Sequence, residues 1–163
     1  MALRQLRVKD DPILFKTSRT VTKLNDRLNE LIDDMFETMY ENDGVGLAAV
    51  QVGVLRRIVV IDIGDGVQRI LINPELLEFD GEQEIQEGCL SVPGKVGKIK
   101  RPFHVKIKAQ DRDMKEHEYE ATGFLAEAFC HEIDHTNGIL YDSKVEGDLI
   151  DVSTLYGDEG DIN

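Results

Sequence analysis

The clearest hydrophobic pattern in the chain predicts an amphipathic helix that begins at Asn25. Apolar residues recur at intervals of three and four positions, the spacing that places side chains on one face of a helix. They are Leu24, Leu28, Leu31, Ile32, Met35, Phe36 and Met39. Asn25 is a suitable N-cap, and the helix should end near residues 42–44, which are Asn-Asp-Gly. We expect the Met and Phe side chains of this face to pack in the core.

Strand patterns follow this helix. Residues 58–63 read as a buried strand, and the Gly-Asp-Gly sequence at 64–66 turns the chain into a second strand over residues 68–73. Residues 1–23 show neither period, so we expect an irregular arm with one helical turn. Further extended segments are expected at residues 74–79, 82–86, 104–110 and 115–121.

A second helix is expected to start after Gly123 and to stop near residues 137–138, which are Asn-Gly. Its first turns are apolar enough to be buried. The same helix carries His131 and His135, which differ by about 40° around the axis and about 6 Å along it, so both rings can face one point. A divalent metal fits between them, and Glu132 can reach a water on that metal. The alternative is a solvated helix with this spacing by chance, but buried histidines beside carboxylates need a partner.

Length and charge limit the interpretation further. The chain has 163 residues, which suits one domain over residues 1–163, and a formal net charge of −13. Such an acidic chain should repel phosphate backbones, so nucleic acid is not expected as a substrate. No apolar run reaches the roughly 20 residues of a membrane span, and the N-terminus lacks a signal-peptide pattern, so we expect a cytoplasmic protein without a membrane partner. Residues 143–163 form a short acidic tail that we expect to be mobile.

A catalytic metal of this kind needs a third protein ligand and an open position for water. The extended metalloprotease pattern would place a third His at position 141, where the chain has Tyr141. Glu146 and Glu159 are available, but both lie in the acidic tail. An endopeptidase of the zinc-helix type would need one of these downstream ligands.

The two cysteines are the other candidates, and without a secretory signal a metal ligand or free thiol is favoured over a disulfide. Cys130 lies about 100° around the helix from His131 and should point elsewhere. This argues against a closed Cys2His2 binding module. Cys89 follows a Gly on a tight backbone and can approach from a separate segment, so a Cys-His-His site is the best geometric solution.

Three motifs together resemble those of bacterial peptide deformylases, in the order and spacing of that family. They are Gly-Val-Gly-Leu-Ala-Ala-Val-Gln at 44–51, Glu-Gly-Cys-Leu-Ser at 87–91 and His-Glu-Ile-Asp-His at 131–135. The resemblance runs from the first helix to about residue 142. It implies an α+β fold, with mixed and antiparallel strands around a central helix that carries the His pair. It also implies a metal-dependent hydrolase that removes the formyl group from the formyl-methionine of new polypeptides and releases formate.

The resemblance also implies roles for individual residues. Glu132 would be the general base, while the Gln51 side chain and the Leu90 backbone N–H would form an oxyanion hole. The implied metal ligands are Cys89, His131 and His135. Residues holding the substrate backbone would be Val45, Gly46 and Gly88. By position, the pocket for the methionine side chain would be lined by Val45, Ile85, Phe124 and Ala128. Glu127 either points away from that pocket or makes its rim polar.

The resemblance favours Fe²⁺ in the cell, although a Cys-His-His set also accepts Zn²⁺, Ni²⁺ or Co²⁺. The implied partners are the N-formylmethionyl peptides of nascent chains. The ribosome stays open as a partner, because better-known members end in a long basic helix thought to dock there and this chain ends in an acidic tail. Finally, Glu87 and Arg101 are expected to form a pair that orients the Cys89 loop.

Overall fold

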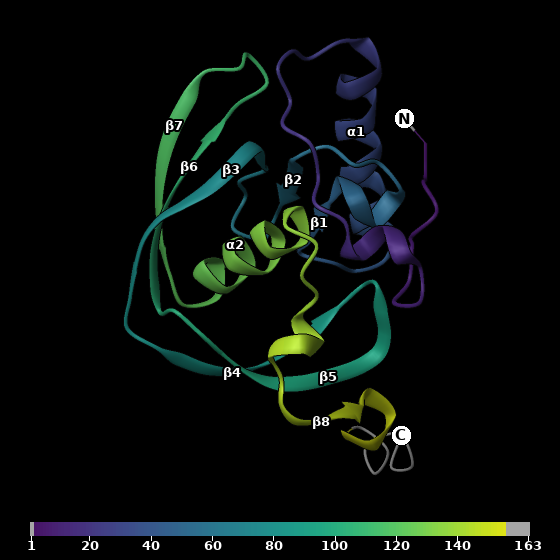
Figure 1. The fold of residues 1–163 in the computed structure, drawn as a ribbon, viewed down its shortest axis with the longest axis vertical. Coiled ribbons are helices and arrows are strands. Elements are labelled where there is room, and N and C mark those ends of the chain that lie inside the picture. The colour runs from purple at the N-terminus through teal and green to yellow at the C-terminus, as the bar shows by residue number, and fades with distance from the viewer. Residues whose placement is uncertain (1, 156–163) are drawn as a thin grey trace.

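Two antiparallel sheets enclose helix α2 (Figure 1). This is a computed structural model, and it describes residues 2–155. The helices are α1 (Asp26–Glu41) and α2 (Gly123–Thr136). The five-stranded sheet has the order β1 (Gly46–Ala48), β2 (Ile58–Ile61), β3 (Arg69–Asp80), β6 (His104–Gln110) and β7 (Glu116–Thr122). The three-stranded sheet has the order β4 (Gln83–Cys89), β5 (Val92–Arg101) and β8 (Glu146–Asp151). Short 3-10 helices span Pro12–Phe15, Ala49–Val52 and Tyr141–Lys144.

The predicted first helix is present, and the sequence signals explain both of its ends. The Asn25 side chain accepts a hydrogen bond from the Leu28 N–H at 2.9 Å and so caps the first turn of α1. At the other end the Asn42 N–H bonds back to the last turn. The apolar face of α1 packs in a buried cluster with β1 and β2, as predicted, and the α+β class is confirmed.

The strand prediction between residues 68 and 79 was wrong in one respect. The structure has one long strand, β3, where the sequence indicated two separate segments. Asn73 lies at a φ of 53°, and the register shifts between Ile72 and Glu75, which marks a bulge. Pro74 is accommodated at this bulge, because a proline has no N–H to give to the ladder. The Asn73 side chain accepts a bond from the Val21 N–H at 2.8 Å, so the bulge also anchors the N-terminal arm.

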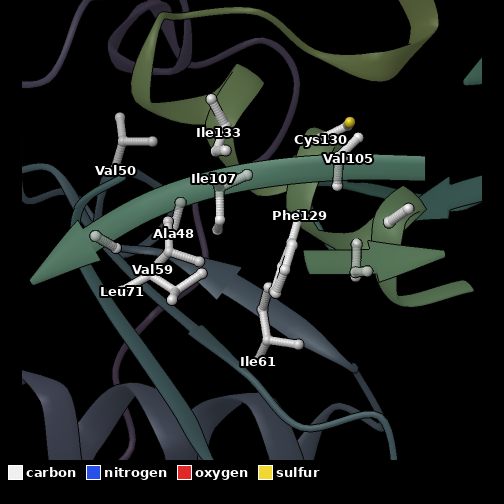
Figure 2. Close-up of a cluster of buried hydrophobic side chains, with 14 residues drawn as sticks. Ala48, Val50, Val59, Ile61, Leu71, Val105, Ile107, Phe129, Cys130 and Ile133 are labelled. Carbon is white, nitrogen blue, oxygen red and sulfur yellow. The ribbon is translucent and has the colours of Figure 1, made fainter. Parts of the chain in front are cut away.

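The main core lies between the five-stranded sheet and α2 (Figure 2). Phe129 and Ile133 of α2 meet Val59, Ile61 and Ile107 from the facing strands. Both helix residues are almost fully buried, which confirms that α2 is an internal helix. The His pair on this helix therefore lies inside the molecule. No helix among residues 2–155 is long and apolar enough to cross a membrane.

The acidic tail differs from the expectation. Residues 146–151, assigned to a loosely organised tail, form β8 and pair antiparallel with β5. The pairing is favoured by opposite charge, since Lys95 contacts Asp151 and Lys100 lies 3.6 Å from Glu146. The sequence pattern does not reveal this strand, because its apolar and polar residues do not alternate and its partner is a distant basic segment. The last part of the predicted tail, residues 156–163, lies outside the described residues.

Candidate active site and metal centre

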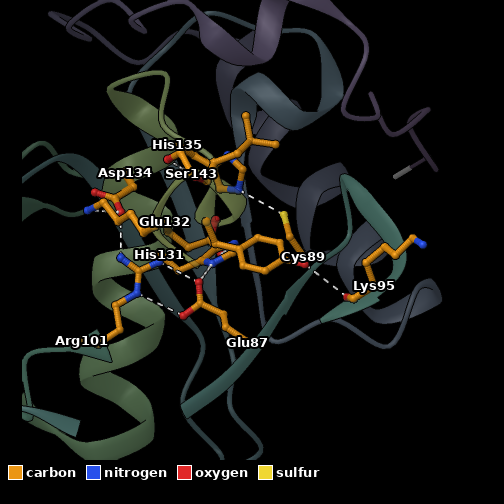
Figure 3. A network of polar contacts seen from close by, with 12 residues as sticks. Glu87, Cys89, Lys95, Arg101, His131, Glu132, Asp134, His135 and Ser143 are labelled. Atoms are coloured by element: carbon orange, nitrogen blue, oxygen red, sulfur yellow. Dashed lines mark hydrogen bonds and ion pairs between the residues drawn. The ribbon is translucent and has the colours of Figure 1, made fainter. Parts of the chain in front are cut away.

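The three predicted ligands meet in one place. Cys89 at the end of β4 faces His131 and His135 of α2 (Figure 3), and their donor atoms all lie within 4.8 Å of one another. Cys89 Sγ is 3.3 Å from His135 Nε2. His135 is fully buried and His131 is 8% exposed, so only one side of the group is open. Cys89 and His135 meet although they lie 46 positions apart in the chain.

The local backbone explains how Cys89 reaches the helix. The β4–β5 ladder breaks its register between Gly88 and Cys89, and Cys89 pairs with Val92 across a tight turn. The bulge redirects the Cys89 side chain toward α2. The motif at residues 87–91 therefore encodes a turn that aims one sulfur at two imidazoles.

The other ligand candidates from the sequence are excluded by their positions. Cys130 lies on another side of α2, among the residues that line a small cavity with Ile133 and Asp134. The Tyr141 hydroxyl donates to the Lys95 carbonyl at 3.3 Å. Glu146 lies on β8 and faces Lys100. Neither a closed Cys2His2 site nor Glu146 as the third ligand fits this geometry; Glu159 lies outside the described residues.

The donor set fits a divalent cation of the type that takes nitrogen and sulfur ligands. A thiolate and two imidazoles suit zinc, nickel, cobalt or ferrous iron. His131 donates through Nδ1 to Glu87 at 2.5 Å, which leaves Nε2 to face the centre of the group. A carboxylate behind a ligating histidine fixes the ring and its tautomer, as in many metal sites.

A buried charge network supports His131 from behind. Glu87 accepts two bonds from Arg101, at 3.1 and 2.7 Å, so the pair predicted from the sequence is present. Arg101 also donates to Asp134 at 2.7 Å, and Lys144 lies 3.0 Å from Asp134. Burial alone would raise the pKa of Glu87, but the bonds from His131 and Arg101 outweigh it and lower the pKa to about 2. No local sequence pattern marks Asp134 and Lys144 as members of this network.

Glu132 lies at the open side of the group formed by Cys89, His131 and His135. Its Oε2 lies 3.9 Å from His131 Nε2, and its Oε1 is buried without a hydrogen-bond partner in the described part of the chain. Burial raises the pKa of this carboxyl to about 7. Gly46 lies directly against it, because a Cβ at that position would be 2.6 Å from Glu132 Oε2. A carboxyl in this position is suited to accept and return a proton near neutral pH.

The Gln51 side chain is fixed in one orientation. Its Oε1 accepts from the Ala48 N–H at 2.9 Å, so the amide nitrogen must point the other way. That nitrogen donates to Ser91 Oγ at 3.1 Å and approaches Cys89 Sγ at 3.6 Å. The Gln51 side chain therefore places an amide N–H beside the Cys89 ligand.

An open cavity of about 520 Å³ leads to these residues. Val45, Phe124 and Ala128 line it, together with Gly46, Gly88 and Leu90. Ile85 is not among the residues that line this cavity, and it packs, as Cys89 does, against the buried cluster around Tyr141. Ile85 shares its strand face with Glu87, because alternate side chains of a strand point to opposite faces.

The cavity also contains features that the sequence left undecided or missed. Glu127 lines it and faces Glu87; burial, and then the Glu87 charge, raise its pKa to about 8. The rim is therefore polar on this side. Leu6 from the N-terminal arm and Val152 after β8 complete the wall. No local motif marks these two residues, since each reaches the cavity only through the path of a terminal segment.

Comparison with known proteins agrees with the geometry. The sequence profile of the family described as polypeptide deformylase matches residues 3–148. The chain belongs to this family. It is 56% identical to the peptide deformylase of Agathobacter rectalis, over 94% of this chain and 96% of that protein. It is 55% identical to that of Lachnoclostridium phytofermentans, over 98% of each.

Solved deformylases share the fold. The crystal structure of peptide deformylase from Thermotoga maritima aligns with a TM-score of 0.86 at 42% identity, over 89% of this chain and 99% of that one. The structure from Synechococcus elongatus, a complex with actinonin, has a TM-score of 0.85 at 36% identity, over 88% of this chain and 79% of that one. The chain is accordingly a metal-dependent hydrolase that removes the N-formyl group from the formyl-methionine of newly made polypeptides and releases formate.

Proposed function

We propose that deformylation is carried out by the residues gathered at the open face of the Cys-His-His group. The observation that carries this proposal is the convergence of Cys89 Sγ with the ring nitrogens of His131 and His135 beside the unpartnered Glu132 carboxyl. These three side chains would hold the cation. When bound, a divalent cation supplies Lewis acidity, which lowers the pKa of a coordinated water and polarises a carbonyl.

Glu132 moves the proton in this scheme. Its carboxylate accepts a proton from the water that attacks the formyl carbon, and the new C–O bond makes a tetrahedral species. The carboxyl then returns the proton to the amine nitrogen as the C–N bond breaks, which yields formate and a free N-terminus. The raised pKa of Glu132, about 7, allows both steps near neutral pH.

Gln51 and the Leu90 backbone N–H stabilise the negative charge that develops on the formyl oxygen. The Ala48–Gln51 bond holds the amide nitrogen in place before the reaction, so no reorganisation is needed as the charge forms. Val45, Gly46 and Gly88 hold the substrate backbone. Backbone pairing binds a peptide without reading its sequence, which suits a substrate that varies after its first residue.

We assign the methionine side chain to the part of the cavity lined by Val45, Phe124 and Ala128. Fe²⁺ is the cation that we propose for the cell, and Zn²⁺, Ni²⁺ or Co²⁺ would fit the same ligands in purified protein. Because the substrate is a nascent chain, we propose that the enzyme works in the cytoplasm at the ribosome.

The test is formate release from formyl-Met-Ala-Ser by protein reconstituted anaerobically with Fe²⁺. Glu132→Gln should bind the metal as the wild type does, because Glu132 is not a ligand, while turnover falls by about 10² or more. Cys89→Ala should lose the metal itself. Glu84→Gln, an exposed change on the same strand as Cys89, is the control and should retain activity. A Glu132→Gln protein that turned over normally, or that purified without metal, would contradict the assigned role.

A further inference from the structure

The N-terminal arm, residues 2–11, is bonded to both segments that carry the proposed oxyanion donors. The Arg7 N–H donates to the Gln51 carbonyl at 2.7 Å, and the Lys9 N–H donates to the Ser91 carbonyl at 2.8 Å. Because the two N–H groups lie only two residues apart, one short stretch of main chain bonds to both segments. The arm therefore joins the 3-10 helix that holds Gln51 to the β4–β5 turn that holds Ser91.

Within the described part of the chain, the arm is the only segment with main-chain hydrogen bonds to both of these regions. Among residues 2–155, residues 44–53 make no main-chain hydrogen bond to residues 83–92, because β1 pairs with β2 whereas β4 pairs with β5. The two regions meet directly through side chains, as where the Gln51 amide donates to Ser91 Oγ at 3.1 Å. At the level of the main chain, their relative position depends on the arm.

The arm is fixed at its other end to α1. Asp34, a buried residue of that helix, accepts from the Ala2 N–H at 2.6 Å and from Arg4 Nε at 2.9 Å. The Arg4 N–H also donates to Thr38 Oγ1 at 2.9 Å. A buried carboxylate needs partners of this kind, so these bonds hold the start of the arm against the helix. In Figure 1 the arm is the purple trace that runs from beside α1 toward the β4–β5 turn.

Side chains of the arm hold its later residues in place. Leu6 lines the catalytic cavity. The Arg7 guanidinium lies against Gly53, where an added Cβ would be 2.8 Å from its Nη2. Lys9 Nζ lies 2.7 Å from an Asp142 carboxylate oxygen in the 3-10 helix that follows α2. The arm is thus held by contacts on both sides of its two main-chain bonds.

We propose that the N-terminal arm positions the two oxyanion donors for the reaction. The bond from Arg7 fixes the main chain of Gln51, whose side-chain amide is one donor. The bond from Lys9 fixes the turn that carries the other donor, the Leu90 N–H. This inference rests on the proposed function, which assigns those two donors. Donors stabilise a developing negative charge only in the correct geometry, and a displacement of about 1 Å lowers a rate by up to about 10².

The test replaces a main-chain N–H by an ester oxygen, which removes the hydrogen bond and keeps the side chain. The α-hydroxy analogue of arginine at position 7 removes the bond to Gln51, and that of lysine at position 9 removes the bond to Ser91. Each ester should lower kcat for formyl-Met-Ala-Ser about tenfold, less than the loss of a whole donor. KM and the amount of bound metal should stay at the wild-type values, because the cavity wall and the ligands are unchanged.

The control is an ester at position 11, made with the α-hydroxy analogue of aspartate. It removes the Asp11 N–H bond to the Val8 carbonyl at 2.8 Å and leaves both bonds to the catalytic segments intact. An ester at position 9 also weakens that carbonyl as an acceptor, so the control isolates the bond to Ser91. The position-11 ester should keep the wild-type kcat.

Combination with Gln51→Leu separates this inference from the catalytic proposal. If the Arg7 bond acts through the Gln51 amide, the position-7 ester should lower kcat by less than about twofold once that amide is absent. The position-9 ester should still lower kcat in this background, because the Leu90 N–H remains as a donor. A role of the arm in stability alone predicts a lower melting temperature with an unchanged kcat.

A second pair of variants uses ordinary substitutions. Arg4→Gln removes the ion pair with Asp34 that anchors the arm, and Arg112→Gln removes a comparable ion pair of α1 with Asp33. Arg4→Gln should lower kcat about threefold without a change in KM, and Arg112→Gln should keep the wild-type kcat. Should an ester protein not fold, this pair decides the question, and an unchanged kcat in Arg4→Gln overturns the inference.

Three other results would overturn the positioning role. The first is wild-type kcat in both esters while Gln51→Leu loses activity, which leaves the oxyanion proposal intact and the arm without a part in it. The second is full additivity of the position-7 ester with Gln51→Leu. The third is an equal loss in the position-11 control. Wild-type kcat in Gln51→Leu would instead overturn the oxyanion assignment itself, and this inference with it.

Discussion

The Glu87 carboxylate lies 2.5 Å from Nδ1 of His131 and is itself held by two bonds from Arg101. One buried acidic residue thus connects a strand of the small sheet to a metal ligand on the central helix. Because the acid sits two residues before Cys89, the same strand positions one ligand directly and orients another. The metal site is therefore a property of the contact between β4 and α2 rather than of either element.

Glu87→Gln should weaken metal binding about 10- to 100-fold, because the ring of His131 loses its charged partner and Arg101 is left half-paired. Metal affinity can be measured by competition with a chelator. Glu84→Gln, an exposed change three residues before Glu87 on the same strand, should bind the metal as the wild type does. Equal affinity in Glu87→Gln would show that the carboxylate does not orient the ligand.

Gln51→Leu should keep its metal and lose about 10²–10³ in kcat, since one oxyanion donor disappears while the ligands stay. Ser91→Ala tests the support for that donor, because Ser91 Oγ contacts the Gln51 amide at 3.1 Å. Ser91→Ala should lower kcat much less than Gln51→Leu does. Wild-type turnover in Gln51→Leu would remove the side chain from the oxyanion hole.

Gly46→Ala should lower kcat by about 10², because the added methyl would lie 2.6 Å from Glu132 Oε2 and displace the carboxyl. The double variant with Glu132→Gln gives the matched comparison. If the methyl acts through Glu132, the double variant should be no slower than Glu132→Gln alone. Additive losses would mean that Gly46 serves the substrate backbone independently.

Glu127→Leu should lower KM for formyl-methionyl peptides about three- to fivefold, since an apolar side chain replaces a half-buried carboxyl beside the proposed methionine pocket. Steady-state formate release gives KM and kcat separately. Glu127→Gln keeps the shape without the acid and should stay near the wild-type KM. A raised KM in Glu127→Leu would indicate that the carboxyl contacts the substrate favourably.

Val152→Glu should raise KM several-fold and leave kcat unchanged, because Val152 forms part of the cavity wall and is neither a proposed metal ligand nor a proton-transfer group. Ser153→Glu adds the same charge at the next, exposed residue and serves as the control. An equal rise in KM for both variants would indicate that the added charge, rather than the altered cavity wall, weakens substrate binding.

The sequence by itself determined the features that depend on a single segment of the chain. The period of apolar residues and the Asn25 cap specify α1, and the four-residue spacing of His131 and His135 places two imidazoles on one side of α2 whatever surrounds that helix. The motifs at 44–51, 87–91 and 131–135 were sufficient to indicate the family and the three ligands.

Only the tertiary structure decided what depends on contacts between distant segments. Strand β8 has no apolar alternation and exists because its acidic residues face the lysines of β5. The continuity of β3 through the bulge at Asn73 and the entry of Val152 into the cavity each depend on register. A one-residue change of register moves a side chain to the other face of a sheet, and the sequence of a strand alone does not fix its register. The residues that make the chemistry possible were thus visible in the chain, whereas their enclosure and support came from pairing that no single segment encodes.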